Sequence, residues 1–166
     1  MDGVLNINLE KYKHIEENLQ KAEQQIPESL YSRIEMLYIP IMLNGKLLKA
    51  FVDTGAQTSI ITQDAAQKVG IDTLIDDRIS GEAIGVGSGK IVGKIHYTEI
   101  VIGSHLVPTS FSVMESMPAL DLILGLDILV RYGCDLKLGT KELYIGGEII
   151  KFMSAQEIDK MALISD

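Results

Sequence analysis

The residues best suited to chemistry lie between positions 51 and 60, where the chain reads Phe51-Val-Asp-Thr-Gly-Ala-Gln-Thr-Ser-Ile60. An apolar run leads directly into Asp53-Thr54-Gly55, and a second apolar run follows. An ionised carboxylate at the end of a buried strand destabilises a protein unless it is paired. Thr54 can lock the turn through its hydroxyl, and Gly55 lets neighbouring backbone approach closely. We therefore expect Asp53 to be an acid–base group, with an ordinary acidic turn residue as the alternative.

Short strands must position Asp53. From Met36 onward, apolar runs broken by Gly, Asn, Asp and Pro indicate a mostly β domain. Asn44-Gly45 predicts a type I′ hairpin between Met36–Leu43 and Lys46–Val52, the strand that ends at Asp53. We expect Thr62 to cap a helix at Gln63–Val69, which Gly70 ends. Further strands are predicted at Ile79–Ile84, Ile91–Ile102, Leu106–Val113, Leu120–Leu124, Asp135–Leu138, Leu143–Ile145 and Ile149–Phe152, with a short helix after Ser154.

A faint internal repeat links two of these segments. Leu48–Val52, a turn and a helix are echoed by Leu120–Leu124, Gly125 and a predicted helix at Leu126–Tyr132. Each half has an apolar strand, a glycine-containing turn and a short helix behind it. Two such halves, related by a pseudo-twofold axis, would build one compact β lobe.

The N-terminal region has a different pattern. Apolar residues recur there at spacings of three and four, which predicts an amphipathic helix whose opposite face carries Lys, Glu and Gln. These residues are Leu5, Leu9, Tyr12, Ile15, Leu19, Ala22 and Ile26. Pro27 ends that helix or begins a short turn at Glu28–Ile34. We interpret the segment as a packing or linking helix.

Composition limits the classes of function. The formal charge is −8, which argues against a nucleic-acid-binding surface because phosphate contacts need clustered Lys and Arg. No apolar run is long enough for a membrane span, and the first residues lack the layout of a signal peptide. Cys134 is the only cysteine, so no disulfide framework or cysteine zinc site is expected within one chain. We expect a cytoplasmic location, with the nucleus as an alternative.

Several segments together resemble the retroviral-type aspartic protease domain, most closely that of the DNA-damage-inducible ubiquitin-shuttle family. They are Met36-Leu-Tyr-Ile39, Lys49-Ala-Phe-Val-Asp-Thr-Gly-Ala-Gln57, Gly85-Val-Gly87, Gly93-Lys-Ile-His96 and Asp121-Leu-Ile-Leu-Gly-Leu-Asp127. The resemblance covers about Met36 to Phe152. Viral enzymes usually carry an ion pair at the places held here by Gln57 and Leu126. Because both members of the ion pair are replaced here, no charge is left unpaired, and this favours the cellular group.

The resemblance implies a mainly β fold, a retropepsin-like acid protease lobe with a flap hairpin and short helices, preceded by an N-terminal helical segment. We expect a helical segment at residues 1–34, as the end of a helical domain or a linker. The protease domain is expected at 35–153 and a C-terminal tail at 154–166. The ubiquitin-like and ubiquitin-associated modules of the family would lie outside these residues.

The chemistry that the resemblance implies needs two carboxylates that share one proton. Two like charges about 3 Å apart cannot both ionise, so the ionised member activates a water and the neutral member polarises the scissile carbonyl. No cofactor or metal is required. Since the chain has one Asp-Thr-Gly, the second carboxylate is expected from another copy, in a symmetric homodimer.

The glycine-rich segment around positions 85–89 lacks the spacing of a phosphate-binding loop. It is expected to form a mobile flap over an extended peptide, with an ordinary flexible hairpin as the alternative. Apolar pocket walls would favour hydrophobic residues around the cut. The residues expected to bind substrate are Ala56, Gln57, Ile84, Gly85, Val86, Gly87 and Ile123.

The leading hypothesis is an aspartic endopeptidase that acts on polypeptides, including ubiquitinated ones. The first alternative is a dimeric scaffold of a proteasomal ubiquitin shuttle with little or no turnover. The second, a phosphoaspartyl enzyme, needs a further acidic residue two positions after the nucleophile or a nearby Lys and Mg²⁺ site. Gly55 stands two positions after Asp53, which disfavours that reading.

Overall fold

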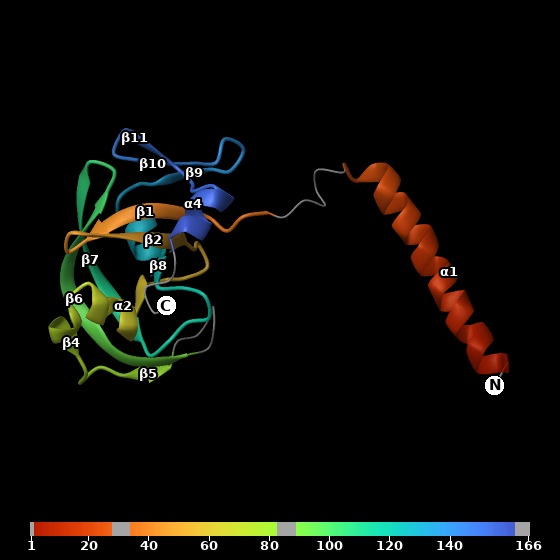
Figure 1. Cartoon of the computed structure of the whole chain (residues 1–166), viewed down its shortest axis with the longest axis horizontal. Coiled ribbons are helices and arrows are strands. Elements are labelled where there is room, and N and C mark those ends of the chain that lie inside the picture. The colour runs from red at the N-terminus through yellow and green to blue at the C-terminus, as the bar shows by residue number, and fades with distance from the viewer. Residues whose placement is uncertain (1, 28–33, 83–88, 162–166) are drawn as a thin grey trace. The chain divides into compact units, whose positions relative to one another are not determined.

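The computed structural model describes residues 2–27, 34–82 and 89–161, without the side chains of residues 2–8 and 82. It divides into two compact units, Met1–Glu35 and Met36–Asp166, which we describe separately. The first unit contains α1 (Asp2–Gln25), a single uninterrupted helix (Figure 1). Most of the predicted turn at Glu28–Ile34 lies outside the described residues. The predicted division into three segments remains a prediction.

The second unit is built around one large sheet. Its strands follow the order β1-β2-β8-β3-β7-β6-β4, β5 pairs with β6, and β1 also pairs with β6, so the sheet curls back on itself. The strands are β1 (Tyr38–Leu43), β2 (Lys46–Val52), β3 (Ile60–Thr62), β4 (Ile75–Asp76), β5 (Gly81–Glu82), β6 (Lys90–Ile102), β7 (His105–Met114) and β8 (Leu122–Leu124). A second sheet contains β9 (Asp135–Lys137), β10 (Glu142–Ile145) and β11 (Glu148–Lys151). The fold is therefore mainly β, as predicted.

In the described part of this unit, three short α-helices and one 3₁₀ helix accompany the sheets: α2 (Gln63–Lys68), α3 (Leu126–Leu129), α4 (Ala155–Lys160) and η2 (Asp72–Leu74). The Thr62 hydroxyl accepts the Ala65 N–H at the start of α2, which confirms the predicted cap. The predicted capping box is also present, since Ser154 and Glu157 bond reciprocally at the start of α4.

The hairpin that leads to Asp53 also forms as predicted. Asn44 and Gly45 have φ angles of 50° and 78°, and a type I′ turn requires positive φ at both central positions. The strands pair from Tyr38↔Phe51 to Leu43↔Lys46. This register fixes where β2 ends.

Two of the predicted elements differ in the structure. The strand predicted at Ile79–Ile84 is wrong at its beginning: Ile79 lies in a bend, only β5 pairs, and Ile84 lies outside the described residues. β4 was not predicted; its second residue, Asp76, accepts hydrogen bonds from the backbone and guanidinium of Arg78 in the turn that follows. The helix predicted at Leu126–Tyr132 ends at Leu129 and continues as a hydrogen-bonded turn up to Gly133, where φ is 59°.

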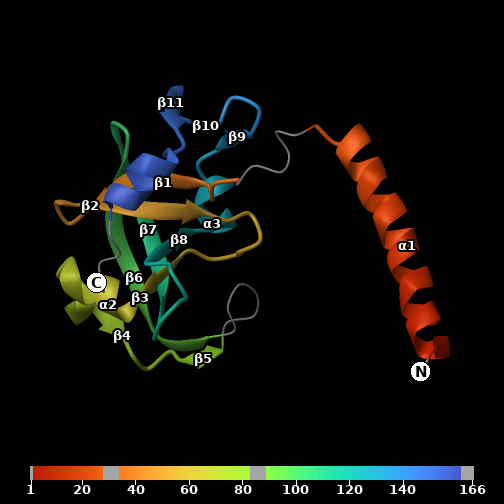
Figure 2. The same cartoon turned by 45° about the vertical axis from the view of Figure 1, so that its right-hand side comes forward.

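The two apolar strands of the internal repeat lie side by side. β2 and β8 are parallel, with Phe51 opposite Ile123 and Val52 opposite Leu124, and β3 pairs antiparallel with β8. Leu122 and Leu124 have no exposed surface and belong to the main core. Figure 2 shows the end of β2 close to the start of α3. A rigid core therefore supports the turn that carries Asp53.

Candidate active site

Asp53 directly follows β2, and its position is set by backbone hydrogen bonds. Its N–H donates to the Leu124 carbonyl at 3.0 Å, which extends the β2–β8 pairing by one residue. Its Oδ1 accepts the Gly55 N–H at 2.8 Å, and its carbonyl accepts the Ala56 N–H at 3.3 Å. Asp53 therefore has a defined rotamer at the junction of the two repeat strands.

The other carboxylate oxygen of Asp53 has no such partner. Oδ2 is buried, and no hydrogen bond reaches it from any part of the chain that the structure describes. A buried acceptor without a donor costs about 1–3 kcal/mol, and most such atoms in native proteins find a partner. Asp53 thus has one carboxylate oxygen fixed by its own turn and one buried oxygen that no described group satisfies.

The rest of the triplet is more open to solvent. Thr54, Gly55 and Gln57 are exposed, and Ala56 is half-buried. The Gly55 and Ala56 N–H groups bond to Asp53 and hold the turn, and the predicted lock through the Thr54 hydroxyl remains a prediction. A Cβ at Gly55 would lie 3.1 Å from Asp53 Oδ1, which explains why a glycine fits there. Exposed Gln57 is compatible with its predicted contact to a substrate, which remains a prediction.

The loop from Asp53 to Ser59 is fastened to the start of α3. The Leu126 N–H donates to the Ala56 carbonyl at 2.8 Å, and the Asp127 N–H donates to the Gln57 carbonyl at 3.1 Å. These free amides of the first helical turn thus find acceptors in the loop. A Cβ at Gly125 would lie 2.7 Å from the Ala56 oxygen, so only glycine allows this approach.

Ser59 and Asp127 complete the fastening, and sequence reasoning missed both roles. The Ser59 hydroxyl donates to Asp127 Oδ1 at 2.7 Å and accepts the Gly125 N–H at 3.0 Å, while the Ser59 N–H donates to Asp127 Oδ2 at 3.0 Å. Ser59 has no exposed surface. One sequence feature could have indicated the role of Asp127: it is a charged residue inside an apolar segment, at the end of the second repeat motif.

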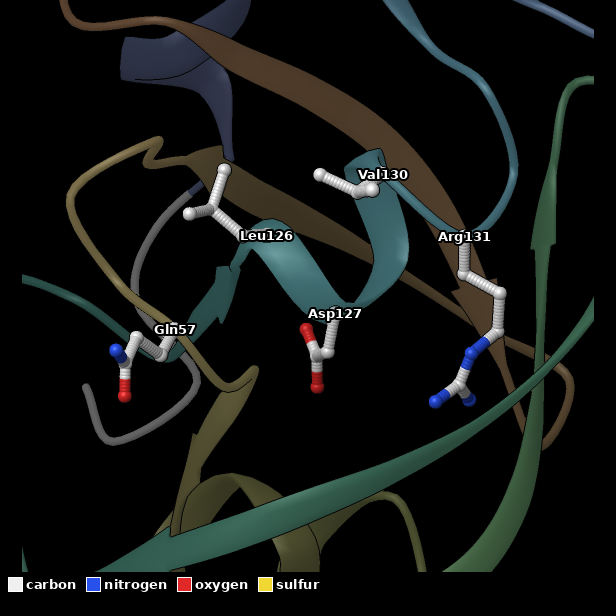
Figure 3. Close-up of a pocket in the computed structure, with 5 residues that line it drawn as sticks. All are labelled: Gln57, Leu126, Asp127, Val130 and Arg131. Carbon is white, nitrogen blue, oxygen red and sulfur yellow. The ribbon is translucent and has the colours of Figure 1, made fainter.

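A hollow of about 490 Å³ opens beside this loop and is lined by Gln57, Leu126, Asp127, Val130 and Arg131. In Figure 3, Leu126 and Asp127 extend from α3, Val130 and Arg131 from the turn that follows it, and Gln57 from the loop after Asp53. The hollow is thus lined by both apolar and charged side chains. It adjoins the loop of Asp53 and lies on the outer face of α3.

Of the remaining predicted substrate residues, only Ile123 lies in the part of the chain that the structure describes. Ile123 has no exposed surface and packs with Ile60, Met114 and Met117, so its predicted role in a pocket wall remains a prediction. The flap residues Ile84, Gly85, Val86 and Gly87 lie outside the described residues. The base of that hairpin is described where Gly81–Glu82 pairs with Lys90–Ile91.

Two polar clusters join neighbouring elements away from Asp53. The Asp76 carboxylate binds Arg78 and His96, and these hydrogen bonds hold the pKa of Asp76 well below its usual value. Glu148 accepts hydrogen bonds from the backbone and hydroxyl of Ser104, which lower the pKa of Glu148.

In the described part of the chain, no three His, Cys, Asp or Glu side chains cluster to hold a metal ion, and no helix could span a membrane.

Comparison with known sequences agrees with the geometry. The family model described as aspartyl protease matches residues 27–137. DNA damage-inducible protein 1 of Cryptococcus neoformans is 43% identical over 146 residues, which cover 88% of this chain and 33% of that protein. Protein DDI1 homolog 2 of Homo sapiens is 39% identical over 157 residues, which cover 93% of this chain and 39% of the relative. The chain spans about a third of the length of the curated relatives it matches.

A solved structure extends the likeness to the fold. The retroviral protease-like domain of Ddi1 from Leishmania major aligns with a TM-score of 0.66 and 39% identity, and the match covers 74% of this chain and 97% of that domain. Sequence identity of 39% over nearly a whole domain, together with the family match, shows common ancestry with these proteins. The chain therefore belongs to the aspartyl protease family, within the retroviral protease-like domains of the Ddi1 proteins.

Proposed function

We propose that this chain is an aspartic endopeptidase that works as a symmetric homodimer, with Asp53 from each copy in a shared site. The observation that carries the proposal is the state of Asp53: Oδ1 is held by its own turn, and buried Oδ2 has no partner in the described chain. An acid of the second copy and the water between them would supply what Oδ2 lacks. The aspartyl protease family supports the same reading.

The proposed reaction uses one proton shared between two carboxyl groups. The ionised group takes a proton from the bound water, and the neutral group donates a hydrogen bond to the scissile carbonyl. Water then adds to that carbonyl, and the proton passes to the amide nitrogen as the C–N bond breaks. The turn amides and the fastening of the loop hold each carboxyl in place, so that little reorganisation is needed.

The dimer follows from the number of carboxyl groups. The sequence has a single Asp-Thr-Gly. A two-fold axis that passes between two copies of Asp53 brings identical groups together, as an isologous interface requires. The exposed neighbours Thr54 and Gly55 would then face their own counterparts. β9–β11 are candidates for sealing the interface, because a small sheet with free edge strands can pair with a second copy.

We extend the proposal to extended polypeptides with hydrophobic residues around the cut, and to ubiquitinated proteins in the cytoplasm or nucleus. Gln57 is exposed beside the catalytic loop and could bind the peptide backbone. Delivery of ubiquitinated substrates rests on relationship to the Ddi1 proteins alone. Profiling the cleaved peptides of a library would test the preference for hydrophobic residues around the cut. Comparing cleavage of a protein with and without attached ubiquitin chains would test the preference for ubiquitinated substrates.

Asp53→Asn tests the central claim. Asparagine keeps the Oδ1 acceptor for the Gly55 N–H but cannot take a proton from water, so we expect peptide cleavage to be lost while the fold is kept. Asp72→Asn, at an exposed acid of a separate turn, is the matched control. The native activity should be blocked by a statine-type peptide and unaffected by chelators. Undiminished cleavage by Asp53→Asn would exclude the assigned role.

Mixing the two forms tests the shared site. If each site needs Asp53 from both copies, adding excess Asp53→Asn chain should lower the activity per wild-type chain as mixed dimers form. Activity that simply follows the amount of wild-type chain would exclude a shared dyad. A protein that dimerises but cleaves no peptide under any condition would instead favour the scaffold.

A further inference from the structure

The apolar stripe of α1 has a seven-residue repeat in addition to its helical spacing. With Leu5 at heptad position a, the later a positions are Tyr12, Leu19 and Ile26, and the d positions after Asn8 are Ile15 and Ala22. The outer positions b, c and f from residue 13 to the end of α1 at Gln25 are all polar. Apolar a and d positions with polar outer positions are the pattern of a two-stranded coiled coil.

This stripe is not covered in the structure. The side chains of Tyr12, Ile15, Leu19 and Ile26 are 59%, 49%, 46% and 39% exposed, and Ala22 is half-buried. A row of large apolar side chains along one face of a helix of 24 residues is costly to leave in water. In proteins, most of the stability of a helix comes from the packing of its apolar face against another element.

We propose that α1 pairs with α1 of a second copy of this chain in a parallel two-stranded coiled coil, with Tyr12, Ile15 and Leu19 in the seam. A helix with a heptad stripe is its own complement, because the a and d positions of each copy pack against those of the other. The proposed catalytic site independently calls for a second copy. This interface lies outside that site and does not depend on it.

The charges beside the seam favour the parallel orientation. In a parallel pair, each g position faces the following e position of the partner. Lys11 is at g and Glu16 at the following e, so each helix would offer its lysine to the glutamate of the other. An antiparallel pair would bring e positions opposite e positions, and Glu16 and Glu23 are both e residues. Like charges there would oppose that orientation.

The consequence is a tether at the N-terminal side of each protease unit. A parallel pair brings both helix C-termini to the same end, so the two copies of unit 36–166 are held at a raised local concentration. The seam is short, about three heptads, and would by itself bind weakly. It would therefore add to a protease dimer and lower the concentration at which that dimer forms.

Site-directed disulfides in the full chain test the pairing. Leu19→Cys places a thiol at a seam position, where identical residues of a parallel pair approach closely enough to bond. We expect Leu19→Cys to give a disulfide-linked dimer on the order of tenfold faster than Gln24→Cys, at an f position on the opposite face. The wild-type chain, whose only cysteine is half-buried Cys134, is the blank.

Equal rates of disulfide formation for Leu19→Cys and Gln24→Cys would overturn the proposal. A Leu19→Cys thiol that bonds only to a cysteine placed near the other end of the partner helix would also overturn it, because that result indicates an antiparallel pair. As a second measure, Leu19→Glu should weaken dimerisation in sedimentation at least severalfold, whereas Gln20→Glu at a b position should not. If the Leu19→Cys chain cleaves peptides but forms no cross-link at the seam, the coiled coil is rejected and the protease proposal stands. If it forms the cross-link but cleaves no peptide, the coiled coil stands and the protease proposal is rejected.

Discussion

Ser59 and Asp127 are 68 residues apart in the chain, yet their side chains meet at 2.7 Å beneath the loop that carries Asp53. Each oxygen of the Asp127 carboxylate accepts a hydrogen bond from Ser59, one from its hydroxyl and one from its backbone N–H. The same hydroxyl accepts the buried Gly125 N–H. The pair thus joins the first half of the repeat to the second and holds the loop that follows Asp53 against α3.

Ser59→Ala should weaken both stability and catalysis. The change removes the bond to Asp127 and leaves the Gly125 N–H buried without an acceptor, which costs about 1–3 kcal/mol. Because Asp53 would then be less firmly held, we expect kcat to fall while KM changes little. Urea unfolding and peptide cleavage measure the two effects. Thr58→Ala, at the exposed neighbouring position, is the control; equal behaviour of the two variants would show that the fastening is unimportant.

Gly125→Ala should displace the catalytic loop by steric contact alone. Gly125 has φ −98°, which any residue can adopt, but an added Cβ would lie 2.7 Å from the Ala56 oxygen and 2.8 Å from the Thr58 oxygen. We expect a loss of about 1–3 kcal/mol in stability and a larger fractional loss of cleavage. Gly139→Ala, where an added Cβ meets nothing within 4 Å, provides the matched control. Full activity of Gly125→Ala would show that the loop can move without harm.

Asp76→Asn should lower the melting temperature with a distinctive dependence on pH. Hydrogen bonds from Arg78 and His96 depress the pKa of Asp76 from its ordinary value of 3.8. A depressed acid contributes stability above its ordinary pKa, and this contribution is lost only as the pH falls through the lower folded-state value. The difference from wild type should therefore persist from neutral pH down to the ordinary value and shrink below it. A difference that has already vanished in mildly acidic buffer, or that matches Asp72→Asn, would contradict this role.

Glu148→Gln should loosen the contact between the β6–β7 turn and the β10–β11 hairpin. Bonds from the Ser104 N–H and hydroxyl to Glu148 Oε2, at 3.0 and 2.7 Å, lower the pKa of Glu148 below its ordinary 4.5. The pH dependence has the same sign as for Asp76. The contribution of Glu148 to stability is complete above its ordinary pKa and is lost as the pH falls through its lower folded-state pKa. Thermal melts at neutral and acidic pH should show a gap that narrows in acid. Glu142→Gln on β10 should show no such narrowing.

Much of the fold could be read from local chemistry. Asn44-Gly45 specifies a type I′ turn, Thr62 and Ser154 cap their helices, and alternating apolar residues mark most strands, because each signal acts within a few residues. The strand predicted at Ile79–Ile84 was wrong at its first residues, which follow a turn where Asp76 bonds to Arg78 and to His96, 20 residues further along the chain than Asp76. Local patterns carry no information on such distant partners.

The amino-acid sequence alone predicted the hairpin that leads to Asp53 and the family of the domain, because turn residues and short motifs are local signals. The role of Asp53 in catalysis is a prediction that Asp53→Asn tests. Only the tertiary structure decided how the turn that carries Asp53 is held. The contacts of Ser59 with Asp127, the backbone of Ala56 against Gly125 and the partnerless Oδ2 of Asp53 arise where distant segments meet. Packing of β2 against β8 brings those segments together, and no spacing along the chain encodes the distances between them.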